Sequence, residues 1–256
     1  GGDLYQKGTL APTNPVSVYY GGKELTPEES TNTSFGFVWD ATDALNVTFD
    51  FYSIELEDRI TQGDDISITP ADIALLQSLG VPGAGDLTNF RFYVNDFDTT
   101  TEGFDVVATY ETEIGNGNTS FTFVYSDVET EVDRTGGLIG SGRIDQLEKL
   151  LPGKRWNLSA VHNTGDWRML ARMNWVDEWF TEEWGGGGGY ISDMSTIDLE
   201  VSRDIGDYTF TLGAQNAFDD YPDKEKRGLI LGWEYPEASP LGFNGAFYYF
   251  KVGLDF

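Results

Sequence analysis

The chain has 256 residues and a formal net charge of −27, from 16 Lys and Arg against 43 Asp and Glu. This acidity excludes a nucleic-acid partner, because no basic surface is available to neutralise phosphates. Cysteine is absent and His162 is the only histidine, which excludes a disulfide framework, a thiolate metal site and a multi-histidine zinc site. We therefore expect no cofactor and no metal.

The N-terminal segment gives little structural signal. The chain opens with Gly1-Gly2-Asp3 instead of a methionine and a basic, apolar leader, so we expect a mature, processed or fragmentary chain. Residues 1–30 show no helical periodicity and are expected to form a lead-in segment. No stretch of about 18 apolar residues, enough for a transmembrane helix, occurs anywhere in the sequence.

From residue 31 onward, apolar and polar residues alternate in about nine runs, the pattern of half-buried β-strands. The charged residues inside these runs all occupy the polar side, whereas Arg203, just beyond one run, falls on the apolar side. In chain order the runs cover residues 34–40, 45–52, 103–110, 121–126, 155–161, 167–175, 197–202, 208–215 and 248–256.

Short and long connections alternate between these runs. Tight turns rich in Gly, Asn and Asp lie at 41–44, 114–118, 164–166 and 205–207, and long connections at 59–90, 132–152, 180–191 and 218–244. One end of the sheet would thus carry only turns and the other only loops, as in bacterial outer-membrane barrels. We predict an all-β, antiparallel up-and-down transmembrane β-barrel, with the apolar side toward lipid and the polar side inward. Nine strands leave an open edge, so further strands are expected in sequence not shown or before residue 31.

One long connection carries a different period. Ile144, Leu147, Leu150 and Leu151 recur at helical spacing, which predicts a short helix within residues 141–151.

Several segments resemble the barrel of TonB-dependent outer-membrane receptors. After the penultimate run, a family motif is matched by Asn216, Phe218, Asp219, Tyr221 and Pro222, with Ala217 in place of the usual Leu. Leu25–Ser30 resembles the family's Leu-x-Pro-Glu-x-Ser, Val47–Ile60 its strand ending in Asp-Arg-Ile, and Thr101–Asp105 its Thr-x-Gly-x-(Asp/Glu) strand. The last strand resembles the signal read by the barrel-assembly machinery, with Phe250, Val252, Leu254 and Phe256.

The resemblance implies that residues 31–256 form roughly the last nine strands of a 22-stranded barrel whose plug domain is absent here, with residues 1–30 as an extracellular segment. It implies the outer membrane of a Gram-negative bacterium, and TonB-energised uptake of a scarce nutrient: a siderophore, a metal chelate, cobalamin or an oligosaccharide. The N-terminal plug and the TonB complex would be partners through sequence that this chain does not contain. No enzymatic activity is implied.

Candidate ligand contacts are aromatic residues on the long loops, because aromatic faces bind sugars and other planar or amphipathic ligands. They are Trp179, Trp184, Trp233 and Tyr235, for which membrane-interface anchoring and loop packing are the alternative. The polar-side charges are expected to pair with one another or with the plug. They are Asp105, Arg168, Arg172, Asp198, Glu200 and Lys251.

Two other functions remain open at this point. An autotransporter translocator barrel also ends in an aromatic strand, but it requires twelve strands and an N-terminal helix threading the pore. A soluble carbohydrate-binding β-sandwich would bury the apolar sides of its strands against each other. No catalytic set stands out, since a Ser-His-Asp site would have to use His162, which the alternation places against lipid.

Overall fold

The computed structural model describes residues 6–182, 188–224, 232, 234–236 and 238–254. It divides into two compact units. The first consists of residues 1–32, 54–100 and 131–144, and the second of residues 33–53, 101–130 and 145–256. Within the described ranges, no helix is long and apolar enough to cross a membrane.

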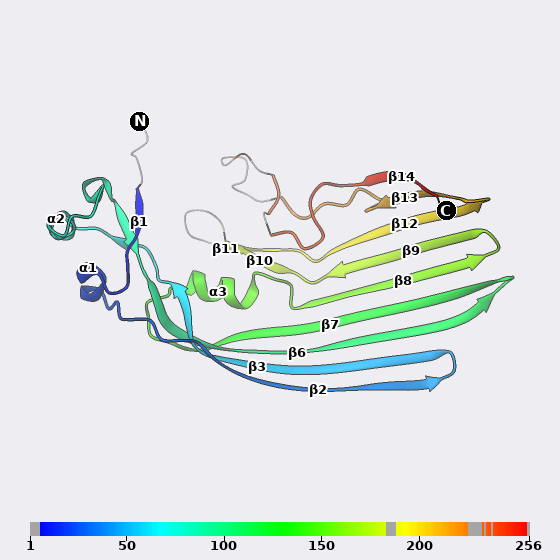
Figure 1. Ribbon diagram of the computed structural model, residues 1–256, viewed down its shortest axis with the longest axis horizontal. Helices are drawn as coiled ribbons and strands as arrows, with labels where there is room; N and C mark the ends of the chain where they lie inside the picture. The colour runs from blue at the N-terminus through cyan, green and yellow to red at the C-terminus, as the bar shows by residue number, and fades with distance from the viewer. Residues whose placement is uncertain (1–5, 183–187, 225–231, 233, 237, 255–256) are drawn as a thin grey trace. The chain divides into compact units, whose positions relative to one another are not determined.

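A nine-stranded sheet contains all nine strands predicted from the alternation (Figure 1). Its spatial order is β14-β13-β12-β9-β8-β7-β6-β3-β2, so each strand lies beside the preceding strand of the same sheet and the edges are β14 and β2. This is the predicted up-and-down meander, and the two edges do not pair with each other. The strands are β2 (Glu29–Thr42), β3 (Leu45–Gln62), β6 (Tyr93–Ile114), β7 (Gly117–Thr135), β8 (Lys154–Thr164), β9 (Trp167–Val176), β12 (Met194–Ile205), β13 (Tyr208–Gln215) and β14 (Phe247–Leu254).

The tight turns lie where the sequence predicts them. Gly165 between β8 and β9 has φ +53°, and Gly206 between β12 and β13 has φ +61°. Two-residue hairpin turns require this left-handed backbone, which glycine adopts without steric cost. Thr164 therefore pairs directly with Trp167, and Ile205 with Tyr208.

The apolar side of the large sheet is exposed. Phe35, Trp39, Leu212 and Phe250 are 59–62% exposed. A β-sandwich would bury these side chains against a second sheet, so the soluble-sandwich alternative is wrong. Aromatic rings also stack from strand to strand on this side, with centroids 5.5 Å apart for Phe37 on Phe49. Further ring pairs continue the row: Phe49–Phe104, Phe104–Tyr125, Phe123–Trp156 and Trp156–Trp175.

Most strands are longer than the alternation predicts, and three of them extend into or toward the expected long connections. β3 continues to Gln62, β6 begins at Tyr93 and β7 continues to Thr135, so the expected connections 59–90 and 132–152 are shorter than predicted. The apolar positions move from odd numbers, ending at Phe51, to even numbers, beginning at Ile54. Because the side facing a core alternates with period two, such a change of parity looks like the end of a strand.

The first unit also contains a small sheet with two helices. The sheet has the order β1-β5-β4, from β1 (Lys7–Thr9), β5 (Asn89–Arg91) and β4 (Ile66–Ser67). The helices are α1 (Pro15–Tyr19) and α2 (Pro70–Ser78), followed by the 3-10 turn η1 (Ala84–Asp86). In the described part of residues 1–30, α1 has only five residues and is too short to thread the pore of a barrel.

A compact core stabilises this small sheet, and a side-chain cap, Asn14 or Thr69, precedes each of the two helices. Val16, Leu76 and Phe90 are fully buried and form one hydrophobic cluster. At the start of α2, Thr69 accepts a hydrogen bond from the Asp72 amide while the Asp72 carboxylate accepts one from the Thr69 amide, a capping box ahead of the helix.

The second unit adds a short hairpin between β9 and β12. β10 (Trp179–Glu182) pairs antiparallel with β11 (Gly188–Ile191), inside the connection predicted over 180–191. Trp179 is 1% exposed and packs in a small core with Val176, Ile191 and Met194. The helix predicted within 141–151 is α3 (Ser141–Lys149), in which Lys149 pairs with Asp145 one turn earlier.

Candidate functional site

The polar side of the sheet carries a network centred on Glu200. Arg168 on β9 donates to one Glu200 oxygen at 2.9 Å, and the Tyr249 hydroxyl on β14 donates to the other at 2.7 Å. The Lys251 ammonium lies 3.6 Å from the same carboxylate. The prediction that polar-side charges pair with one another is confirmed for these three charges. The network thereby joins three strands by charge-assisted hydrogen bonds.

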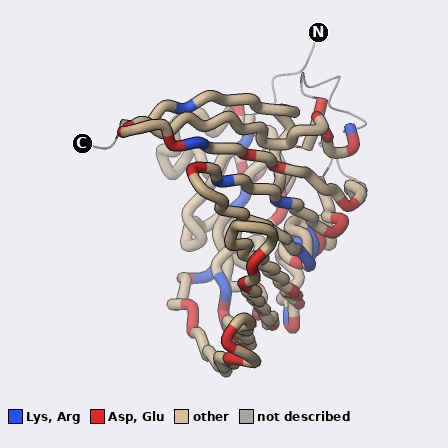
Figure 2. Tube along the Cα trace, turned by 90° about the vertical axis from the view of Figure 1, so that its right-hand side faces the viewer, with Lys and Arg blue, Asp and Glu red and all other residues tan. Residues whose placement is uncertain are grey.

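Acidic residues occur in both units, as the colouring of Figure 2 shows. Asp198, also on the polar side of β12, accepts hydrogen bonds from the Asn174 side chain at 3.1 Å and from the Asn216 amide at 2.9 Å. The Asp198 carboxylate on β12 thus binds the backbone at Asn216, the residue that follows β13 and begins the family-like motif.

The motif Asn216–Pro222 folds into a side-chain-locked turn. Asn216 has φ +48°, a left-handed conformation that asparagine tolerates better than most residues. Its side-chain amide donates to the Asp220 carbonyl at 2.7 Å and its side-chain carbonyl accepts from the Asp220 amide at 3.0 Å. The Ala217 amide still donates to the Ile197 carbonyl on β12 at 2.7 Å, so the turn forms directly at the end of the strand pairing.

The same motif contacts the beginning of β14. Asp219 accepts hydrogen bonds from the Ala246 amide at 2.8 Å and from the Tyr221 hydroxyl at 3.1 Å. The Tyr221 ring stacks on Tyr235, with centroids 5.2 Å apart. Phe218 is 65% exposed. Asp219 near the beginning of the connection between β13 and β14 is thus hydrogen-bonded to Ala246 at its end.

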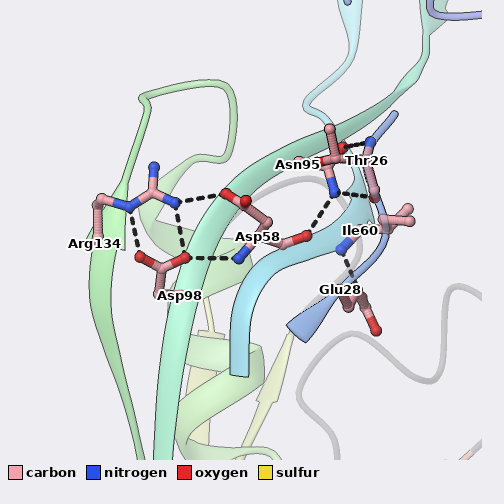
Figure 3. Close-up of polar contacts among 7 residues, drawn as sticks. All are labelled: Thr26, Glu28, Asp58, Ile60, Asn95, Asp98 and Arg134. Atoms are coloured by element: carbon pink, nitrogen blue, oxygen red, sulfur yellow. Dashed lines mark hydrogen bonds and ion pairs between the residues drawn. The ribbon is translucent and has the colours of Figure 1, made fainter. Parts of the chain in front are cut away.

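In the first unit, Arg134 on β7 binds two carboxylates (Figure 3). Its guanidinium contacts both oxygens of Asp98 on β6, at 2.5 and 2.7 Å, and one oxygen of Asp58 on β3 at 3.1 Å. Asp58 has φ +52°, and its amide donates to Asp98 at 2.8 Å. Three strand extensions are therefore joined by one bidentate cation, a geometry that arginine provides and lysine does not.

Two segments that resemble the receptor family meet at this point. The Asn95 side chain accepts from the Thr26 amide at 2.8 Å and donates to the Thr26 and Asp58 carbonyls (Figure 3). The Glu28 carboxylate accepts from the Ile60 amide at 2.6 Å. The segment Leu25–Ser30 is thus tied to the strand that ends in Asp58, Arg59 and Ile60.

The Arg134 contacts change the acidity of Asp98. Hydrogen bonding by the Arg134 guanidinium, supported by the Asp58 amide, lowers the pKa of the Asp98 carboxyl below its ordinary value despite partial burial. A membrane-spanning β-strand needs about 9–11 residues. Counted from the turn at Gly115, such a span would end well before Asp98, which lies in the extension of β6.

A recess of about 470 Å³ adjoins this cluster. Lys23 and Arg134 line it together with the acidic residues Glu24, Asp58 and Asp96, and its wall also includes Thr26, Asn95 and apolar Val94. Sequence reasoning missed Asn95 and Arg134 as site residues. Their partners lie 36 to 76 positions away in the chain, and no periodic pattern reports such contacts.

The predicted ligand contacts are placed as follows. The Trp179 indole is packed inside its core, and Tyr235 stacks on Tyr221 and Phe243. Trp184 and Trp233 lie outside the described residues, so the ligand role of the four stays a prediction. In the predicted assembly signal, Phe250, Val252 and Leu254 are exposed on β14, while Phe256 lies outside the described residues. Among the residues that the structure describes, no three metal-ligating side chains gather into a cluster.

Comparisons with known proteins agree with this architecture. The family model described as "TonB dependent receptor-like, beta-barrel" matches residues 1–217. Comparison with the curated proteins finds no match.

Solved structures share the fold at low sequence identity. The FrpB iron transporter from Neisseria meningitidis superposes with a TM-score of 0.59 at 12% identity, over 88% of this chain and 31% of FrpB. The outer-membrane transporter YddB from Escherichia coli gives 0.62 at 11% identity, over 91% of this chain and 33% of YddB. The ferripyoverdine receptor of Pseudomonas aeruginosa gives 0.53 at 18% identity, over 78% and 25%.

The chain therefore spans about a third or less of the length of these transporters. The sheet, the one-sided loops and the match over residues 1–217 all indicate the same family. The chain belongs to the TonB-dependent receptor family and forms part of its β-barrel.

Proposed function

We propose that the protein containing this chain is an outer-membrane receptor of a Gram-negative bacterium that takes up a scarce nutrient with energy from the TonB complex. The chain contributes barrel wall and extracellular loops, while an N-terminal plug and the contact with TonB belong to sequence outside it. The barrel-assembly machinery would recognise its last strand. Family membership is the observation that carries this proposal.

Among the nutrient classes, we propose a metal chelate such as a ferric siderophore. Two of the structural relatives are named as an iron transporter and a ferripyoverdine receptor. In the recess beside Arg134, whose guanidinium already binds Asp98 and Asp58, Lys23 offers a donor to the carboxylate or hydroxamate oxygens of a chelate, with Thr26 as a neutral partner. Cobalamin and oligosaccharides are the alternatives within the same transport function.

Uptake by the full receptor tests the proposal. The receptor is produced in a Gram-negative host that lacks its own siderophore receptors, and the cells are given ⁵⁵Fe-loaded hydroxamate and catecholate siderophores. We expect accumulation that requires an intact tonB gene and stops when a protonophore collapses the proton gradient. Labelled cobalamin and maltooligosaccharides are offered in parallel. Uptake of one of these instead would overturn the metal-chelate assignment, and no TonB-dependent uptake of any would overturn the transport function.

A matched pair of variants tests the recess itself. Lys23→Gln removes an exposed cation that lines the recess, whereas Lys154→Gln removes a cation from the start of β8, outside it. We expect the first to weaken binding of the transported chelate several-fold and the second to leave it unchanged. Equal affinities would show that ligand contacts lie elsewhere in the receptor.

The autotransporter alternative has no observation in its favour. The matched family is a receptor family, and the described part of the lead-in segment, from residue 6 onward, contains a five-residue helix and a three-residue strand, not a helix able to thread a pore.

A further inference from the structure

Arg203 is a cation on the apolar side of the sheet. It lies on β12 with its guanidinium carbon 4.9 Å from the centre of the Trp167 indole. Its neighbours in register are Trp167 on β9 and Phe210 on β13. Among the described residues, no carboxylate lies within ion-pair distance of it, and the nearby Asp204 accepts a hydrogen bond from Thr209 instead. An aromatic face holds the cation without neutralising it.

A mainly apolar groove of about 890 Å³ lies on the neighbouring rows of the same strands; it does not include Arg203 itself, and His162 is among its lining residues. Three alanines line the groove, and their small side chains leave space between the larger neighbouring side chains. Ala160 pairs with Ala171 across β8 and β9, and Ala214 lies on β13. Leu199 pairs with Ala171 on one side and with Ala214 on the other. The groove therefore crosses the strands on the side of the sheet that the family places against lipid.

The groove and the arginine are continuous on one face. Met169, Val201 and Leu212 are paired neighbours at the groove's turn-side end. Trp167 and Arg203 form the next row on the same face, two residues or about 6.6 Å further along the strands. The cation thus stands between the apolar groove and the tight turns.

We propose that this surface binds one anionic phospholipid of the inner leaflet, with its phosphate on Arg203 and an acyl chain in the alanine groove. The inference rests on the membrane placement of the proposed function, which puts the tight turns at the periplasmic boundary. At that level, three residues before Gly206 in the tight turn, a headgroup phosphate meets the guanidinium edge, which forms two parallel hydrogen bonds to such a group. The groove extends from this point into the hydrocarbon region.

Native mass spectrometry of the full receptor tests this inference. The receptor is taken from nanodiscs that contain equal amounts of phosphatidylglycerol and phosphatidylcholine, and the retained lipids are identified. We expect phosphatidylglycerol to be retained about fivefold over phosphatidylcholine, the factor that one interfacial cation provides. Arg203→Gln should reduce this preference to none. Arg172→Gln removes an exposed cation from the opposite side of β9 and should preserve it.

A second variant separates the groove from the charge. Ala171→Phe fills the groove with a residue that lipid tolerates, and we expect fewer retained lipids of both kinds while the preference is kept. Heat-modifiable electrophoretic mobility verifies that each variant is a folded barrel. If the parent receptor itself does not insert into a membrane, the proposed function fails, and the lipid experiment is not the cause of that failure. An unchanged preference in Arg203→Gln, displacement of the lipid by inorganic phosphate, or receptor dimers in place of lipid adducts would each overturn the inference.

Discussion

Asn216→Ala would test whether the family motif holds the connection after β13 in place. The Asn216 side chain makes two hydrogen bonds to the Asp220 backbone, at 2.7 and 3.0 Å, and both are exposed to solvent. Exposure places each at the lower end of the usual range, about 0.5 kcal/mol. Alanine at φ +48° costs about 1 kcal/mol more, since its Cβ is unfavourable in the left-handed region. The local free energy of opening should therefore fall by about 2 kcal/mol.

Amide hydrogen exchange measures this local opening in the full receptor. A decrease of about 2 kcal/mol corresponds to exchange roughly thirtyfold faster at the Asp220 amide. Asn244→Ala is the control, because Asn244 lies exposed in the same connection and its side chain makes no hydrogen bond in the described structure. If the Asn216 variant exchanges at Asp220 no faster than the control, the motif does not hold the turn and the reasoning fails.

Three further predictions concern other contacts. Gly245→Ala should loosen the same connection by at least about 1 kcal/mol, because residue 245 has φ +70° and an added Cβ would overlap the Tyr221 hydroxyl; faster exchange of the 218–224 peptide is the readout. Leu76→Ala should cost the first unit about 2–5 kcal/mol of stability, measured as faster proteolysis within residues 63–92, since Leu76 is fully buried. Asp98→Asn should destabilise at pH 7. Arg134 lowers the folded-state pKa of Asp98, so the stability from this carboxylate is present above about pH 4 and lost as the pH falls further; thermal unfolding of variant and parent should therefore converge in acid.

The strands of the second unit were predictable because one physical constraint acts on every second residue. Lipid on one side and polar groups on the other impose a period of two, and the tight turns require Gly, Asn or Asp at fixed places. β13 was predicted at Tyr208–Gln215 and lies there. The pattern could not, however, show that the sheet continues beyond Phe51 in β3, because the apolar parity changes there.

The first unit was largely missed for a different reason. Its core joins residues that are far apart, such as Val16, Leu76 and Phe90, and each comes from an element of nine residues or fewer. Elements this short give no measurable period. The sequence signal for α2 is local and was missed: Thr69-Pro70 with Asp72 three residues after the cap is a capping box with proline at the first helical position. The burial of Trp179 was missed for a similar reason, since its position in a connection of the sequence does not reveal the small core that it joins.

Arg203 shows how an exception to a pattern gains meaning once the register is known. From the alternation alone, the charge of Arg203 on the apolar side could be explained by placing the end of the strand one or two residues earlier, because assigned ends vary by that much. The pairing of Arg203 with Trp167 removes that explanation, because the residue lies in register within β12 and still faces the apolar side. A charge in that position is unfavourable in hydrocarbon and favourable at a headgroup, so the proposed lipid site would set the membrane boundary on this sheet at the level of Arg203. The lipid measurement with Arg203→Gln is thus also a measurement of where the membrane ends.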